Sequence, residues 1–196
     1  MSIRGYGRYL KSNALEVRRQ VFHLLGIGSW CVPILLFPQS LTLCLMVVII
    51  TMNAFVVLRL GPFLRIFGSI IRCFERERNV RKPGIQAFYA NSGVFLAFLF
   101  FGELSVVGVL VLSVGDALST LTGRLFGKTP SILNPSKTWE GTLAFFVGTF
   151  FVLLPLLGTE ASLLISSLSS LAEALDLRID DNFLLPLFAT ALTYLV

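Results

Sequence analysis

Long apolar runs alternate with short polar segments along the whole chain. Seven such runs are recognised, at 20–37, 41–58, 86–101, 104–122, 142–158, 161–175 and 183–196. A helix needs about 20 apolar residues to cross the hydrocarbon core of a bilayer, and most of these runs approach that length. Because the runs at 86–101 and 183–196 are short, a count of six spans is the alternative. The pattern predicts an all-α, polytopic transmembrane helical bundle of about seven spans, forming one membrane-embedded domain over 1–196.

The composition supports this reading and excludes an ordinary soluble domain. Hydrophobic residues make up 55% of the chain and charged residues 14%, and the mean hydropathy is +0.82. Soluble domains usually carry about 25% charged residues. The chain is therefore expected to be an integral membrane protein whose partner is the lipid bilayer itself.

Basic residues decide the expected orientation. All 16 Lys and Arg fall in four segments that lie on one side of the membrane if the N-terminus is cytoplasmic: 1–19, 59–85, 123–141 and 176–182. Cytoplasmic loops carry the excess of Lys and Arg in membrane proteins. The net charge of +5 then faces anionic lipid headgroups. No nucleic-acid-binding module is recognisable, so nucleic acid is not an expected partner.

One of these basic segments, 59–82, has a helical pattern of its own. Apolar residues recur there at helical spacing, at Leu60, Phe63, Leu64, Phe67, Ile70, Ile71 and Phe74. Arg65, Arg72, Arg76 and Arg78 lie mostly between them. This arrangement is typical of an amphipathic helix that lies in the membrane interface. A cytoplasmic extension of the second span is the alternative.

A carboxylate inside the fourth span needs an explanation. Asp116 precedes Arg124, at the expected inner membrane edge, by eight residues, which places it roughly 12 Å inside the bilayer in a continuous helix. An acid at the centre of a membrane helix costs about 2.5–3.5 kcal/mol on insertion scales. Ser113, Thr120 and Gly123 are expected on the same helical face as Asp116. The stripe indicates a functional site, with a structural acid bonded to a neighbouring helix as the alternative.

Polar faces also end the sixth span and begin the first. The sixth span carries a serine face that ends at Glu173 and is followed by further acids, so that four carboxylates fall within nine residues: Glu173, Asp176, Asp180 and Asp181. Such a cluster repels itself unless cations intervene, and hard divalent cations prefer oxygen ligands. In the first span, Glu16, Arg19, Gln20 and His23 share one face. For His23, lining of a site and a purely structural hydrogen bond are both open.

On the inner face these groups make a combination suited to phosphate chemistry. Asp116, Asp180 and Asp181 could hold Mg²⁺ or another divalent cation. Basic residues on the same face could contact phosphate oxygens: Arg19, Arg124, Lys128 and Lys137. Phosphoryl and nucleotidyl transfer depend mostly on positioning and charge neutralisation. The residues thus favour a membrane enzyme acting on phosphates at the cytoplasmic surface, with a transporter as the alternative, because polar intramembrane stripes also form substrate pathways.

Four stretches of this sequence resemble a known family. "GDALSTLTGRLFGK" followed by "NPSKTWEG" is similar to the signature of CTP-using membrane enzymes of lipid metabolism. These enzymes are the phosphatidate cytidylyltransferases and the related dolichol, phytol and diacylglycerol kinases. "EVRRQVFHLLGIG" and "EALDLRIDDNFLLP" resemble patterns of the kinase branch. The matching motifs span positions 16 to 186, most of the chain.

The resemblance implies roles for individual residues. It implies Asp116, Lys137 and Asp181 as catalytic residues, with Asp116 either a metal ligand, together with Asp180 and Asp181, or the base that takes the alcohol proton. It implies contacts with the nucleotide by Arg19, Arg124, Lys128, Asn134, Ser136, Lys137, Glu140 and Asn182. Glu16, His23, Thr120 and Glu173 would line the site. The segment 123–141 would be the cytoplasmic phosphate-contacting loop.

The activity implied by the resemblance is that of a CTP-dependent lipid kinase. Its acceptor would be a membrane lipid alcohol, namely a polyprenol or dolichol, a phytol-like prenol or a diacylglycerol. "SKTWEG" is very like the cytidylyltransferase version of the motif, so a CDP-lipid synthase is the first alternative. A non-enzymatic transporter or lipid carrier is the second. The sequence leaves a homo-oligomer open.

Overall fold

The computed structural model describes residues 3–61, 82–175 and 177–196, with side chains from residue 13 onward. The described part is mostly helical and forms no strand beyond one isolated bridge between Pro130 and Thr138. The all-α prediction is confirmed. The predicted interfacial helix at 59–82 lies almost entirely outside the described residues, as does Asp176 of the acidic cluster.

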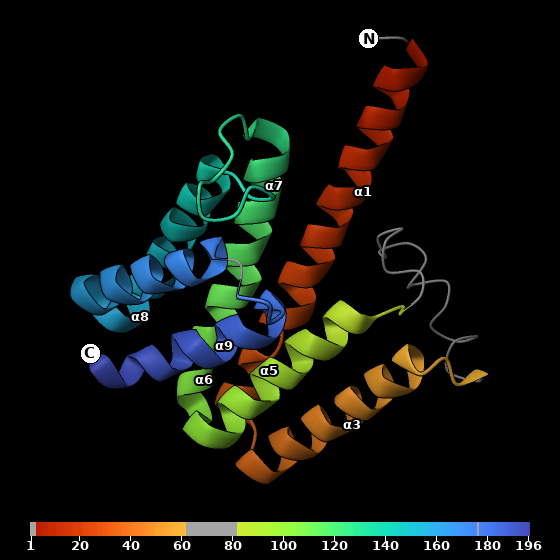
Figure 1. The fold of residues 1–196 in the computed structure, drawn as a ribbon. Coiled ribbons are helices and arrows are strands. Elements are labelled where there is room, and N and C mark those ends of the chain that lie inside the picture. The colour runs from red at the N-terminus through yellow and green to blue at the C-terminus, as the bar shows by residue number, and fades with distance from the viewer. Residues whose placement is uncertain (1–2, 62–81, 176) are drawn as a thin grey trace.

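The helices follow the predicted apolar runs closely (Figure 1). The α-helices are α1 (Ile3–Gly28), α2 (Cys31–Leu36), α3 (Gln39–Val57), α5 (Ile85–Phe101), α6 (Ser105–Leu110), α7 (Ala117–Phe126), α8 (Trp139–Ala174) and α9 (Asp181–Leu192). A π-helical turn, η3 (Val111–Asp116), joins α6 to α7, and short 3₁₀ turns, η2 (Gly102–Leu104) and η4 (Thr193–Leu195), complete the described elements.

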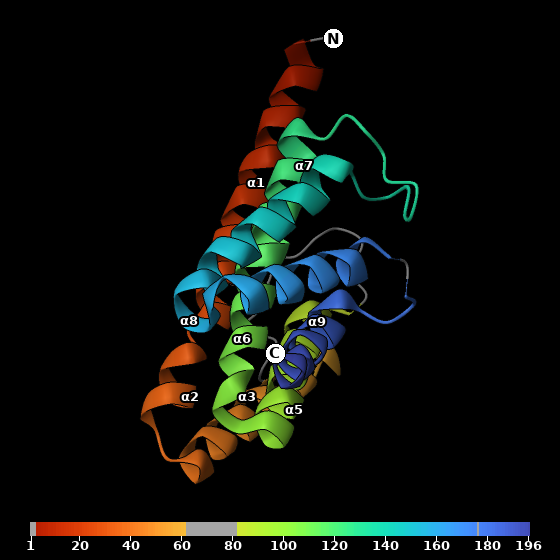
Figure 2. The ribbon, with the colours of Figure 1, turned by 90° about the vertical axis from the view of Figure 1, so that its left-hand side faces the viewer.

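Among the described residues, four stretches are long and apolar enough to cross a membrane: Asn13–Leu36, Gln39–Val57, Ile85–Phe126 and Trp139–Ala174. The last two each contain a sharp reversal at a glycine. Gly102 has φ 57° and Gly158 has φ 77°, a backbone region that glycine adopts without steric cost. The chain therefore doubles back within both stretches, as α5 and α6 and the two halves of α8 show (Figures 1 and 2). The number of spans stays a prediction.

Helix α9 is a central element although it is short. It packs against α5, α6 and α8, and α5 and α9 lie side by side in both views (Figures 1 and 2). The close approach requires a residue without a side chain, because a Cβ at Gly93 of α5 would lie only 2.5 Å from the Phe183 carbonyl oxygen. Leu185 and Ala189 of α9 join the buried apolar core. This packing carries the N-terminal end of α9, with its acids, into the middle of the molecule.

The π turn η3 changes the helical register immediately before Asp116. Such turns occur mostly as single insertions within α-helices and are frequent at functional sites. Ser113, which ideal helical spacing places on the same face as Asp116, is instead buried, and its hydroxyl donates to the Leu110 carbonyl at 3.4 Å. The predicted stripe is therefore wrong at Ser113. Its other members, Asp116, Thr120 and Gly123, face one cavity.

Candidate functional site

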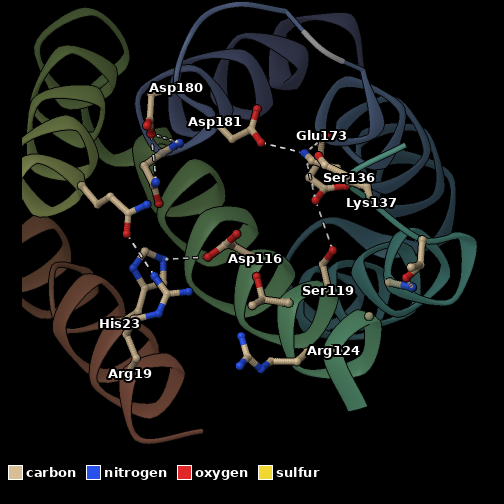
Figure 3. Close-up of a pocket in the computed structure, with 16 residues that line it drawn as sticks. Arg19, His23, Asp116, Ser119, Arg124, Ser136, Lys137, Glu173, Asp180 and Asp181 are labelled. Atoms are coloured by element: carbon tan, nitrogen blue, oxygen red, sulfur yellow. Dashed lines mark hydrogen bonds and ion pairs between the residues drawn. The ribbon is translucent and has the colours of Figure 1, made fainter. Parts of the chain in front are cut away.

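A polar pocket of about 410 Å³ lies where α1, α7, α9 and the two ends of α8 meet (Figure 3). The loop 127–138, between α7 and α8, closes one side of it. Most of the residues that the sequence predicted for the site line this pocket: Arg19, His23, Asp116, Thr120, Arg124, Ser136, Lys137, Glu173, Asp180, Asp181 and Asn182. The fold thus brings together residues that are far apart in the chain.

Lys137 joins the loop to both acidic helix ends. Its ammonium lies 2.7 Å from Asp181 Oδ2 and 3.1 Å from Glu173 Oε1, and it also donates to the Glu173 backbone carbonyl (Figure 3). Burial lowers the pKa of Lys137, but attraction to Glu173 and Asp181 outweighs burial and raises that pKa above its ordinary value. Burial also raises the pKa of the Asp181 carboxyl, against the opposing attraction of Lys137. Lys137 is therefore a permanently charged centre at neutral pH.

Glu173 is the buried member of this group, which we call the Lys137 cluster (Lys137, Glu173 and Asp181). Only 5% of Glu173 is exposed, and its Oε1 accepts a hydrogen bond from Ser119 Oγ at 3.1 Å. Removing one partner of a buried ion pair strands the other charge, which is strongly destabilising. The cluster accordingly fixes α7, the end of α8, the start of α9 and the loop relative to one another.

Asp116 lies across the pocket from this cluster and is held more loosely (Figure 3). Its Oδ2 is 3.7 Å from His23 Nε2, and a quarter of its side chain is exposed. That separation is longer than a hydrogen bond, and His23 Nε2 has no hydrogen-bond partner among the described residues. A carboxylate that is accessible and not committed to a strong partner can receive a proton from a substrate.

Glu16 holds the two arginines that reach the pocket. It is buried, and its Oε1 accepts from Arg19 Nε at 3.0 Å and from Gln20 Nε2 at 3.2 Å, while its Oε2 lies 3.6 Å from Arg124 Nη1. Arg19 also donates to Gln86 Oε1 at 3.0 Å. Glu16 itself does not line the pocket. It therefore acts through the arginines, by orienting two guanidinium groups that suit phosphate oxygens.

Three predicted nucleotide contacts lie outside the pocket lining: Lys128, Asn134 and Glu140. Glu140 Oε1 accepts from the backbone N–H groups of Lys128 and Thr129, both at 3.1 Å. Asn134 Oδ1 accepts from the Ser136 backbone N–H at 3.0 Å and from the Ser136 hydroxyl at 2.7 Å. In this structure Glu140 and Asn134 shape the loop that presents Ser136 and Lys137.

Sequence reasoning missed four lining residues: Gln86, Ser119, Thr138 and Gly141. Thr138 caps α8, since its side chain accepts from the Gly141 N–H at 3.2 Å, and a threonine three residues before that glycine is a recognisable capping signal. Ser119 lies one helical turn beyond Asp116 and could have been found by the same spacing as Thr120. Gln86 follows a Pro-Gly turn and belongs to no motif, so only the packing of α5 reveals it.

The acidic residues of the pocket are suited to a divalent cation that binds together with a phosphorylated ligand. They do not form a complete metal site by themselves. The described residues contain no group of three or more His, Cys, Asp or Glu side chains placed to hold an ion by themselves. Asp181 is engaged by Lys137, and Asp180 Oδ1 accepts from the Asn182 backbone N–H at 3.0 Å and from its side-chain amide at 2.9 Å. Mg²⁺ is usually bound by one or two carboxylates plus substrate phosphates. Asp116, Asp180 and Asp181, facing one pocket, supply a donor set of that kind.

The fold and the pocket together define an integral membrane protein with a pocket lined by charged side chains. Comparison with known proteins gives 30% identity over 175 residues with an uncharacterized protein of Methanocaldococcus jannaschii, covering 87% of this chain and 88% of that one. A chloroplastic phytol kinase of Arabidopsis thaliana is 28% identical over 158 residues, covering 70% of this chain and 51% of the kinase. A CTP-dependent diacylglycerol kinase of Schizosaccharomyces pombe is 29% identical over 152 residues, covering 68% of this chain and 70% of the kinase.

A dolichol kinase of Schizosaccharomyces pombe is also similar, with 25% identity over 204 residues, 93% of this chain and 40% of the kinase. The chain thus spans about half or less of the phytol and dolichol kinases it matches. No family model and no solved structure matches it. Phytol kinases, dolichol kinases and a CTP-dependent diacylglycerol kinase are thus homologues of this chain.

Proposed function

We propose that the protein is a membrane lipid kinase that transfers the γ-phosphate of CTP to the hydroxyl of a lipid alcohol. The observation that carries this proposal is the arrangement of one pocket. A loosely held carboxylate, Asp116, faces a set of fixed cations, Arg19, Arg124 and Lys137, in a chain related to kinases of three lipid alcohols. The preference for CTP rests on the relative whose name states CTP dependence.

The cations bind and orient the nucleotide. Arg19 and Arg124 reach the pocket with their guanidinium groups held by Glu16. Two planar guanidinium groups are therefore in position before a phosphate binds. Phosphoryl transfer involves little covalent chemistry by the protein, and positioning with charge neutralisation supplies most of the catalysis. Asp180 and Asp181 are the residues that would hold a divalent cation together with the nucleotide. When bound, that ion would neutralise charge on the phosphate oxygens.

Asp116 acts as the general base. The lipid hydroxyl gives its proton to an Asp116 carboxylate oxygen, the hydroxyl oxygen attacks the γ-phosphorus, and the bond to the β-phosphate oxygen breaks. The products are the lipid monophosphate and CDP. A positioned base of this kind contributes about 10²–10⁴-fold to the rate. His23, 3.7 Å away, keeps the carboxylate facing the pocket and can share its proton after transfer.

The pocket is proposed to open at the cytoplasmic face, where CTP is available. Its walls include basic residues of segments that the sequence predicts to be cytoplasmic, namely Arg19 of α1, Arg124 near the end of α7 and Lys137 of the loop 127–138. The acceptor hydroxyl reaches Asp116 from the bilayer side while the lipid tail stays among the helices. Any lipid alcohol of the three relatives' classes is compatible with this geometry.

Two labels on CTP separate the candidate functions. The purified protein is incubated with Mg²⁺, a panel of prenols, diacylglycerols and phosphatidate, and CTP labelled at either the α or the γ phosphorus. The kinase transfers only the γ label to an alcohol. A CDP-lipid synthase, favoured by the "SKTWEG" stretch, would instead transfer the α label to phosphatidate, which the panel includes. Transfer of neither label to any lipid would contradict both enzyme functions and leave the transporter or lipid carrier.

A further inference from the structure

A second cavity, of about 700 Å³, lies beside the polar pocket and is bounded by α1, α2, α3 and α5. Its lining is mainly apolar and includes Phe22, Ile27, Val32, Phe37 and Ile49. We call this cavity the apolar groove. Several of these side chains remain exposed in the protein, with Phe22 at 51% and Val32 at 53%, so in a membrane the groove opens to the hydrocarbon of the bilayer.

The apolar groove is continuous with the polar pocket. Arg19, His23 and Gln86 line both cavities, and His23 is the residue that faces Asp116. From His23 the groove follows the rest of α1 and then α2 as far as Phe37, a path of roughly 20 Å at the rise of an α-helix. An ordinary lipid-facing surface is neither hollowed nor joined to a charged site, and this one is both.

Away from His23, the polar side chains in the groove already form hydrogen bonds within the protein. Trp30 Nε1 donates to Asn91 Oδ1 at 2.8 Å, and Asn91 Nδ2 donates to Asn53 Oδ1 at 3.1 Å and to the Ala87 carbonyl at 2.9 Å. The Ser29 hydroxyl donates to the Gly26 carbonyl at 2.8 Å. A ligand with ester groups inside this groove would lose hydrogen bonds to water with little in exchange, which is costly. A plain hydrocarbon chain loses none.

We propose that the apolar groove binds the chain of the acceptor, and that this acceptor is a prenyl alcohol with a single hydrocarbon chain. The chain lies along α1 and α2, and its hydroxyl emerges between His23 and Gln86 to meet Asp116. This inference rests on the proposed kinase function and adds the class of its substrate. Diacylglycerol, with two chains and two esters next to its hydroxyl, fits the groove less well.

Gly26 allows the groove to be filled without disturbing the fold. It lines the groove, and a Cβ built on it meets no atom within 4 Å. Its φ is not in the left-handed region, unlike that of Gly84, Gly102 and Gly158. A side chain at Gly26 therefore projects into the space assigned to the lipid chain, and replacing a helical glycine favours the helix.

The test compares Gly26→Phe with Leu25→Phe in the full-length protein. Leu25 is the neighbouring residue, is 66% exposed and does not line the groove. Each variant is assayed with a long prenol and with a short alcohol of one isoprene unit. For Gly26→Phe, the KM for the long prenol rises roughly tenfold, as expected when about two methylene groups leave the groove. Its KM for the short alcohol and both values for Leu25→Phe stay at the wild-type level.

A second measurement does not depend on activity. A long prenol that carries a photoreactive diazirine in its chain is crosslinked to the protein, and the labelled peptides are identified by mass spectrometry. Labelling of residues 22–37 in the wild type and its loss in Gly26→Phe support the groove, even if no phosphate is transferred and the kinase function fails. An unchanged KM for the long prenol, an equal loss with both alcohols, labelling elsewhere, or a preference for diacylglycerol would each overturn this inference.

Discussion

The two sides of the polar pocket are built in different ways. On one side, the Lys137 cluster is tight, with ion-pair distances of 2.7 and 3.1 Å and a glutamate that is 5% exposed. On the other side, a quarter of the Asp116 side chain is exposed, and its Oδ2 lies 3.7 Å from His23 Nε2. The tight side fixes helices and the loop in place, and the loose side leaves a carboxylate free to exchange a proton. The proposed proton transfer is therefore assigned to the side of the cavity that ion pairs constrain least.

The largest expected effect tests the loose side. Asp116→Asn removes the proton acceptor but keeps the shape, so transfer to the lipid falls about 10³-fold, within the range for a general base. The unfolding temperature in detergent changes little, because Asp116 makes no close ion pair. Thin-layer separation of the labelled lipid measures the rate. Near-normal transfer by this variant would contradict the assignment of Asp116 as the general base.

The next effect tests the tight side. Lys137→Met leaves Glu173 and Asp181 without their cation, so it lowers both transfer and stability, the latter by about 3 kcal/mol for a partly accessible buried pair. The double variant Lys137→Met/Glu173→Gln removes the more buried of the two unpaired charges, and it regains most of the stability but no transfer. Denaturant titration and the labelling assay give the two readouts. Full stability in the single variant would contradict the role of the cluster.

A smaller effect tests the residue that orients the arginines. Glu16→Gln keeps a hydrogen-bond acceptor but loses the charge that faces Arg19 and Arg124. The KM for CTP is expected to rise about tenfold, the size of one lost charge-assisted hydrogen bond, with kcat for the lipid falling less. Leu24→Ala is the control, since Leu24 is half-buried on the same helix and lines neither cavity. An equal change in both variants would indicate a purely structural role.

The smallest effect concerns a residue outside the pocket. Lys128 contributes its backbone N–H to Glu140, and its side chain does not line the pocket. Lys128→Ala therefore changes the KM for CTP by no more than about twofold, as for a screened surface charge. Steady-state kinetics at low and high salt provide the measurement. A tenfold loss would show that the loop closes over the nucleotide and brings Lys128 into contact with it.

The sequence predicted the parts of the fold and site that depend on local pattern. The apolar runs predicted the helices, because a helix that is buried or spans a membrane needs a long run of apolar residues. The motifs around Asp116, Lys137 and Asp181 predicted residues that line one pocket. The π turn before Asp116 could not be predicted from the sequence. Ideal helical spacing placed Ser113 on the same face as Asp116, whereas in the structure Ser113 is buried and bonds to the Leu110 carbonyl. The same limit applies to the loop. Only its folded path shows that Asn134 and Glu140 bond to the loop itself.

Pairings between distant segments were also beyond the sequence. The distribution of charged residues predicted acids and bases at the same membrane face, and helical spacing put Glu16 and Arg19 on one face. Neither could assign Lys137 to Glu173 and Asp181, or Glu16 to Arg124. Those pairings depend on how α1, α7, α8 and α9 pack. The pairings of Lys137 also distinguish the fixed side of the pocket from the side proposed to react.

A single-turnover assay with γ-labelled CTP tests the central claim most directly. The wild type and Asp116→Asn are compared at the same temperature, after denaturant titration has shown equal stability, with a long prenol as acceptor. The label should move to the lipid in the wild type and about 10³-fold more slowly in Asp116→Asn. Equal rates in the two proteins, or no γ label on lipid with the wild type, would contradict the assignment of a kinase site at Asp116.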